Sequence, residues 1–162
     1  MKKINFLTQA AMIAALYVVL TLAINAFGLA SGAIQVRVSE ALTILPYFTP
    51  AAIPGLFIGC LLSNTITGCA LFDIIFGSIA TLLGAVGTYL LRRHKWLAPV
   101  PPIIANTIIV PFVLSYVYGT PGTIPYLMLT VGIGEVISCG VLGMVLLFAL
   151  NKYRTILFGV QN

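Results

Sequence analysis

The sequence predicts an all-α polytopic membrane protein, a bundle of six transmembrane helices with both termini in the cytoplasm. Of its 162 residues, 60% are hydrophobic and 7% are charged, and the mean hydropathy is +1.13. Soluble proteins carry about 25% charged residues, so this composition could not keep a folded surface in water. Several apolar runs approach or reach the roughly 20 residues that a bilayer core requires. The length predicts a single transmembrane domain over residues 1–162, with no separate soluble domain.

The first apolar segment, near Phe6–Phe27, is expected to be a retained transmembrane helix. It follows the basic start MKK, as the apolar part of a signal peptide would. However, the segment is longer than such a part, and no clear small-residue cleavage site precedes polar sequence. We therefore place the first crossing here.

The region Val38–Ile66 is apolar but cannot form one regular helix. Its prolines remove backbone donors and clash with the preceding turn; they are Pro46, Pro50 and Pro54. Two short helices, near Val38–Phe48 and Ala51–Ile66 and joined by the turn TPAAIP, fit these breaks better. Pro54 then lies in a first helical turn, where its missing N–H costs little.

Three further apolar segments complete the predicted bundle: Leu71–Leu91, Pro102–Tyr118 and Tyr126–Leu150. Seven of the eight basic residues form three clusters beside apolar runs: Lys2 and Lys3; Arg92, Arg93 and Lys95; Lys152 and Arg154. The positive-inside rule places all three clusters in the cytoplasm, which requires an even number of crossings between the first and the second. Two short spans in Val38–Ile66 satisfy this parity and give six crossings. A re-entrant hairpin there, with four full spans, would satisfy it as well.

The chain's three acidic residues are expected in the outer half of the bundle or near its middle. Glu40 lies one helical turn after Arg37, which is in the first outer loop, and Asp73 opens a helix at its outer end. Glu135 lies about 13 Å below the outer end of the last helix, at 1.5 Å per residue. A charged carboxylate at that depth costs at least about 2.5–3.5 kcal/mol, so it faces a cavity or a partner. Arg37 alone cannot neutralise three carboxylates, whereas a cationic or hydrogen-bond-donating ligand, or a proton relay, would meet the deficit.

Other polar and aromatic side chains are expected near the same outer face. Amide and hydroxyl groups come from Asn25, Asn64 and Thr67, and tyrosines that fit an interfacial aromatic belt are Tyr116, Tyr118 and Tyr126. Phe72 and Phe76 flank Asp73 and could stack on a flat ring, although packing in the core or against lipid is an equal alternative. The candidate ligand-binding residues are therefore Arg37, Glu40, Asn64, Asp73, Phe76 and Glu135.

Several classes of function are disfavoured. The cysteines Cys60, Cys69 and Cys139 are scattered without CxxC spacing, which argues against a metal site or a disulfide framework. His94 is the single histidine and lies among cytoplasmic basic residues, so an intramembrane Ser–His or His–metal enzyme is not expected. No GxxxxGK[ST] motif is present, so any ATP hydrolysis would belong to partner subunits and the chain needs no cofactor of its own. The basic residues flank apolar runs rather than forming a nucleic-acid surface.

The inner half of the first helix carries a stripe of small residues. The stripe consists of two i, i+4 pairs, Ala10 with Ala14 and Ala11 with Ala15. Membrane helices associate through such small residues because their backbones can approach closely. Taken alone, the stripe fits packing against the protein's own helices better than docking on a partner.

The chain resembles the QueT family over the run VRVSEALTILPYFTPAAIPGLFIGCLLSNTITGCALFDIIFGSIATLLGA, which is Val36 to Ala85. The resemblance extends more loosely over nearly the whole chain. A six-helix protein of 17.3 kDa with an alanine-rich first helix is also similar to the substrate-binding S components of energy-coupling-factor (ECF) transporters. The QueT family is assigned to queuosine precursors.

The resemblance implies a multi-pass protein of the cell membrane that binds its substrate from outside and delivers it inward. The alanine face of the first helix, Ala10, Ala11, Ala14 and Ala15, would dock on a transmembrane T component that carries two cytoplasmic ATPases. The 7-deazaguanine ring of queuosine precursors presents an N1–H and a 2-amino group, a donor edge that suits a carboxylate. An aminomethyl group on the ring would favour a second carboxylate.

Other functions remain open from the residues alone. An S component for another vitamin would share everything except the match over Val36 to Ala85. A small proton-coupled carrier or channel would use Glu135 as a relay and would need no ATPase partner. A purely structural membrane subunit would leave the three outer acids unexplained.

Overall fold

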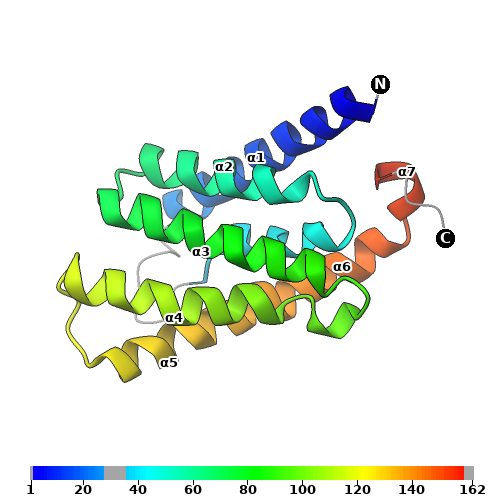
Figure 1. Cartoon of the computed structure of the whole chain (residues 1–162). Helices are drawn as coiled ribbons and strands as arrows, with labels where there is room; N and C mark the ends of the chain where they lie inside the picture. The colour runs from blue at the N-terminus through cyan, green and yellow to red at the C-terminus, as the bar shows by residue number, and fades with distance from the viewer. Residues whose placement is uncertain (1, 28–35, 159–162) are drawn as a thin grey trace.

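The computed structural model describes residues 2–27 and 36–158, and over these residues it is helical without β-strands (Figure 1). In chain order the elements are α1 (Lys2–Ala26), the 3₁₀ helix η1 (Val38–Tyr47), α2 (Ala52–Ile66), α3 (Leu71–Leu90), the 3₁₀ turn η2 (Lys95–Leu97), α4 (Val100–Tyr116), α5 (Ile124–Glu135), the π-helical segment η3 (Val136–Leu142), α6 (Gly143–Asn151) and α7 (Arg154–Phe158). The prediction of an all-α bundle is confirmed for the described part of the chain.

Four helical stretches in the described residues are long and apolar enough to cross a membrane. They are Ile4–Ala26, Leu71–Leu90, Lys95–Tyr116 and Ile124–Asn151. Each corresponds to one of the four long apolar runs in the sequence. The last stretch continues from α5 through η3 into α6. Its π-helical turns were not predicted from the sequence. The helix α2 is also apolar but has only 15 residues.

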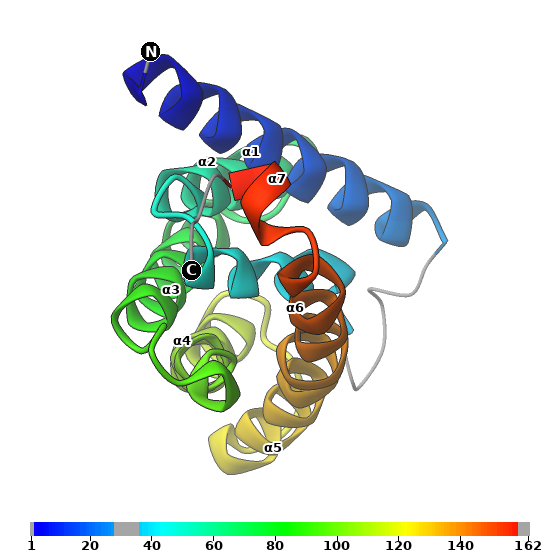
Figure 2. The ribbon, with the colours of Figure 1, turned by 90° about the vertical axis from the view of Figure 1, so that its right-hand side faces the viewer.

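The short element η1 lies at the centre of the bundle. Figure 2 shows it enclosed by the long helices, and it contacts α1, α2, α3, η3 and α6. All residues from Ser39 to Pro46 are buried. The two elements expected in the region Val38–Ile66 are therefore present, with the first one inside the protein.

The first of the two short helices, whose type the sequence did not indicate, is a 3₁₀ helix of 10 residues. Such runs rarely exceed three or four residues, because their hydrogen bonds are poorly aligned. The 3₁₀ form rises about 2.0 Å per residue against 1.5 Å for an α-helix, so ten residues reach about 20 Å instead of 15 Å. In an α-helix the ring of Pro46 would clash with the carbonyl group four residues earlier, and contacts with five surrounding elements hold the 3₁₀ form in place.

The three basic clusters gather at one end of the bundle, here called the basic end. Figure 1 shows at its right side the start of α1, the α3–α4 connection and the α6–α7 turn. The α2–α3 and α4–α5 connections lie at the opposite end. This arrangement is the one that the positive-inside rule requires of the three clusters.

The helices α1 and α2 pack closely through small residues. A Cβ atom added at Gly55 would lie 2.7 Å from the backbone oxygen of Ala10, and one added at Gly59 would lie 3.1 Å from Cα of Ala14. Ala10 and Ala14 are accordingly 6% and 7% exposed. Half of the predicted alanine stripe is thus used inside the protein.

The other half of the stripe, Ala11 and Ala15, is exposed on α1. Each of them follows a buried alanine directly and so lies about 100° around the helix from the contact with α2. In this chain they are therefore the alanines that remain free for lipid or for a partner helix.

The topology can be tested with single reporter cysteines in a background that lacks the three native cysteines. Thr123→Cys, at the start of α5, should react with a membrane-impermeant maleimide from outside intact cells, because it is exposed at the end opposite the basic clusters. His94→Cys is exposed at the basic end and should react only after the membrane is opened. Labelling of both from the same side would contradict the topology.

The packing of α1 on α2 predicts different effects for two glycine substitutions. Gly59→Ala should lower stability by about 1–3 kcal/mol, the usual cost of overpacking, since its Cβ would lie 2.8 Å from Cβ of Tyr17. Gly140→Ala is the matched control, because its Cβ would meet only ordinary contacts at 3.7 Å and beyond. Thermal unfolding in detergent measures both, and equal melting temperatures would show that α1 and α2 do not pack as described.

Candidate ligand-binding site

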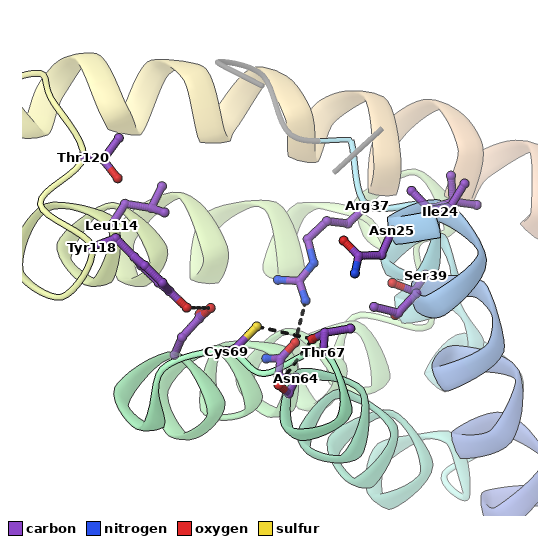
Figure 3. Close-up of a pocket in the computed structure, with 13 residues that line it drawn as sticks. Ile24, Asn25, Arg37, Ser39, Asn64, Thr67, Cys69, Leu114, Tyr118 and Thr120 are labelled. Carbon is purple, nitrogen blue, oxygen red and sulfur yellow. Dashed lines mark hydrogen bonds between the residues drawn. The ribbon is translucent and has the colours of Figure 1, made fainter. Parts of the chain in front are cut away.

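A pocket of about 360 Å³ lies at the end of the bundle opposite the basic clusters (Figure 3). Its wall is formed by the end of α1, the start of η1, the end of α2, the start of α3 and the end of α4. The polar residues that line it are Thr21, Asn25, Arg37, Ser39, Asn64, Thr67, Asp73, Tyr118 and Thr120. Apolar side chains, Ile24 and Leu114 among them, complete the wall.

Arg37 is fixed at the pocket by bonds to two other elements. Its guanidinium donates to Asn64 Oδ1 of α2 at 3.0 Å, as Figure 3 shows. Its backbone N–H donates to the hydroxyl of Ser138 in η3 at 3.1 Å. Arg37 immediately precedes the central element η1, so these bonds tie the start of η1 to α2 and to η3.

Asp73 lies in the first turn of α3 and is held from the end of α4. The hydroxyl of Tyr118 donates to Asp73 Oδ2 at 3.0 Å, and the same hydroxyl accepts the backbone N–H of Ala70 at 3.0 Å. Partial burial, together with the neighbouring Asp73 carboxylate, raises the pKa of Tyr118 to about 12. The phenol therefore keeps its proton at physiological pH and remains a donor to Asp73.

Gly77 leaves room for the polar groups on this side of the pocket. A Cβ atom there would lie 3.2 Å from Asn64 Nδ2 and 3.4 Å from Asp73 Oδ1. The absence of a side chain at Gly77 thus lets the amide of α2 and the carboxylate of α3 approach the same space. A guanidinium, an amide, a carboxylate and a phenol meet in one small pocket, which suits a planar molecule with both donor and acceptor edges.

Glu40 and Glu135 lie together but do not line this pocket. Glu40 is in η1 and Glu135 ends α5, and with Cys139 of η3 they place one carboxylate or thiol atom each within 4.8 Å of one another. All three are buried. The hydroxyl of Tyr17 on α1 donates to Glu40. The two acids thus form a second polar cluster in the interior of the bundle.

Phe76 lies apart from both polar groups. It lines an apolar groove of about 520 Å³ between α3 and α4, together with Phe72, Phe112 and Tyr116. Phe76 is 43% exposed there and stacks on Phe72 with ring centroids 6.3 Å apart. The structure therefore brings Arg37, Asn64 and Asp73 into one pocket, pairs the other two acids elsewhere, and places Phe76 with neither group.

Three features of the site were missed by the sequence analysis. Tyr118 was interpreted as part of an aromatic belt, and its bond to Asp73 joins residues 45 positions apart, which no local spacing indicates. Cys69 was considered only as a possible metal-site or disulfide residue, yet it lines the pocket. Ser138 and Cys139 are buried in the π-helical segment η3, and their positions three and four residues after Glu135 were a helical spacing that could have grouped them with it. The glycines around Glu135 were the one available signal of unusual backbone in that segment.

Comparison with known proteins agrees with the resemblance seen in the sequence. A curated protein named "Queuosine precursor transporter QueT", from Lactococcus lactis, is 37% identical over 86 residues, which cover 52% of this chain and 50% of that protein. The match thus spans half the length of that relative. No solved structure matches the chain significantly. A family model described as QueT transporter matches residues 7–152, nearly the whole chain. The protein therefore belongs to the QueT transporter family.

Proposed function

We propose that the protein is the substrate-binding S component of an ECF transporter and takes up a queuosine precursor across the cell membrane. Membership of the QueT transporter family and the name of its Lactococcus lactis relative support this function. The observation that carries it is the pocket, in which the Arg37–Asn64 pair and the Tyr118–Asp73 pair lie at the end opposite the basic clusters. The positive-inside rule makes that end the outer one.

The proposed topology has six crossings with both termini in the cytoplasm. The elements η1 and α2 form two short crossings that run between the same two ends of the bundle, with η1 enclosed by the other helices and α2 at the surface between α1 and α3. A 3₁₀ helix in the bilayer is tolerated where protein surrounds it and satisfies its backbone. The burial of η1 meets that condition.

The pocket suits a 7-deazaguanine ring by its chemistry. The N1–H and 2-amino edge of the ring would donate to the carboxylate of Asp73, a charge-assisted pair. The ring's carbonyl oxygen would accept from the guanidinium of Arg37 or the amide of Asn64. Leu114 and Ile24 supply apolar contact to a flat ring. Asp73 is therefore the first carboxylate that a ligand entering from outside would meet.

The proposed partners are a T component and two ATPases, so the chain itself would need no cofactor. The exposed alanines Ala11 and Ala15 are the part of the stripe that a partner helix could approach closely. Ala10 and Ala14 already pack on α2. Docking through the exposed half would leave the pocket untouched, because the pocket lies at the other end of α1.

A proton-coupled carrier is the second candidate, and the buried Glu40–Glu135 pair favours it. Carboxyl groups inside transmembrane bundles serve as proton relays in pumps and transporters. The two candidates differ in their energy source. Uptake that continues in cells lacking the ATPase partners, and collapses when the proton gradient is dissipated, would identify the carrier.

Asp73→Asn should weaken binding of 7-deazaguanine ligands without unfolding the protein. Loss of one charge-assisted bond costs about 1.5–3 kcal/mol, roughly ten- to a hundredfold in Kd. Tyr118→Phe should weaken binding as well, because it releases Asp73 Oδ2. Tyr116→Phe is the matched control, since Tyr116 is 77% exposed and does not line the pocket. Calorimetry on the purified variants measures Kd, and an Asp73→Asn protein with the parent's affinity would remove Asp73 from the site.

Ala15→Phe should abolish uptake in cells while leaving ligand affinity unchanged. A bulky side chain on the exposed face of α1 would prevent close approach of a partner helix. Leu16→Phe, at a position that is 50% exposed and about 100° around the helix from Ala15, is the control for added bulk outside the exposed half of the stripe. If Ala15→Phe transports as the parent does, the exposed half of the stripe is not the docking face.

A further inference from the structure

Glu40 and Glu135 form a buried carboxyl pair in which one oxygen atom, Glu40 Oε2, receives no hydrogen bond from the described residues. Glu40 is 1% exposed and Glu135 is 6% exposed. The hydroxyl of Tyr17 donates to Glu40 Oε1, and the thiol of Cys139 donates to Glu135 Oε2 at 3.2 Å. Glu40 Oε2 is buried without a hydrogen-bond partner in the described part of the chain. A buried acceptor in this state is costly, so a donor is expected to serve it.

The surrounding hydroxyl and thiol groups cannot supply the missing donor. The hydroxyl of Thr43 already donates to the backbone oxygen of Glu40 at 2.6 Å. The thiol of Cys139 also lies 3.4 Å from that oxygen, but it has a single proton, which it donates in the hydrogen bond to Glu135. The phenol of Tyr17 is likewise used by Glu40 Oε1.

The charges around the pair do not balance either. Seven of the chain's eight basic residues belong to the clusters of the basic end, which leaves Arg37 as the positive residue on the side of the pair. Two carboxylates and one guanidinium would leave a net negative charge in the interior of the bundle. Two carboxylates that share a site also disfavour each other's ionisation. A single proton would remove the excess charge and provide the missing donor at once.

We propose that Glu40 and Glu135 bind one proton between them, as a second ligand held in the interior beneath the pocket. The protonated carboxyl group of one residue donates to the carboxylate of the other, and Arg37 balances the charge that remains. This assignment does not depend on which molecule the pocket binds. It gives the two interior acids a role that differs from that of Asp73.

The elements packed around the pair present few other titratable groups. Those that face it are Tyr17 of α1, Cys60 of α2, Cys139 of η3 and Arg37 at the start of η1. The acidic residue of α3, Asp73, lies in the pocket, and α6 contains no titratable residue. Tyr17 and Cys139 act here as neutral donors, so neither replaces the proton.

The residues that would hold the proton are sequence neighbours of residues at the pocket and share hydrogen bonds with them. Ser39, the residue before Glu40, lines the pocket with Arg37. Ser138, the residue before Cys139, binds the backbone N–H of Arg37. Removal of the proton would therefore place an uncompensated charge beside the groups that hold Arg37 at the pocket.

The sign of the pH dependence follows from proton counting. In the unfolded chain both carboxyl groups are ionised at neutral pH, whereas the folded protein retains one proton. Because the folded state binds more protons, its stability should fall as the pH rises through the range in which the pair releases that proton. Carboxylates in hydrogen bonds or ion pairs usually show the opposite trend.

Infrared titration of the purified, ligand-free protein tests the proposal. The parent should show the carbonyl stretch of one buried, protonated carboxylic acid at neutral pH, and this band should convert to carboxylate on alkaline titration. Glu135→Gln should lose the band, because a single carboxylate balanced by Arg37 needs no proton and the new amide can donate to Glu40. The melting temperature of this variant should also no longer fall at alkaline pH, as that of the parent does. Asp73→Asn is the control and should keep both the band and the decline.

Two results would overturn the proposal. The first is a parent protein that shows no protonated carboxylic acid at neutral pH, a measurement that needs no variant to fold. The second is a band or an alkaline decline that persists in Glu135→Gln and in Glu40→Gln. In that case the proton belongs to another group.

Discussion

The structure depends on enclosing a short, irregular helix in the centre of a membrane bundle. Backbone groups in a bilayer must find partners within the protein, and the 3₁₀ ladder of η1 is poorer than an α-helical one. Five elements, α1, α2, α3, η3 and α6, pack around η1 and exclude lipid from it. The glycines of α2 let α1 approach closely enough to complete this enclosure. Without it, η1 would have no stable place in the membrane.

The enclosure of η1 also positions both polar clusters of the protein. Arg37, at the start of η1, reaches the pocket, where Asn64 fixes its guanidinium. Glu40, three residues later, points into the interior, where it meets Tyr17 and the pair partner Glu135. The π-helical turns of η3 contribute to each cluster, through Ser138 to the first and through Cys139 to the second. One extended central element therefore connects the pocket to the interior carboxyl pair.

Much of the fold could be predicted from the sequence because bilayer thickness and charge are strong constraints. Apolar run lengths located the four long spans, and the prolines of Val38–Ile66 divided that region into η1 and α2. The 3₁₀ form of η1 could not be predicted, since it is imposed by neighbours that are distant in sequence. The division of the alanine stripe was equally hidden, because it depends on Gly55 and Gly59 of another helix.

The candidate site was predictable in its chemistry but not in its grouping. The cost of a charge in the bilayer singled out all three acids. Which of them share a space depends on the tertiary fold, and the structure separates Asp73 from Glu40 and Glu135. Phe76 follows Asp73 by three residues, yet it faces the groove between α3 and α4. Helical spacing places residues three apart on nearly the same face, so the separation of these two side chains depends on how α4 packs beside α3, which spacing alone does not indicate.

The most direct test of the central claim, that the pocket binds the ligand, uses the native cysteines. Cys69 lines the pocket and is half-buried, whereas Cys60 and Cys139 are 0% and 1% exposed. The rate of Cys69 modification by a water-soluble maleimide should be measured with and without an aminomethyl-7-deazaguanine, at a concentration shown to bind. Occupation of the pocket should slow the modification of Cys69 in proportion to the bound fraction. An unchanged rate at full binding would place the ligand elsewhere in the protein.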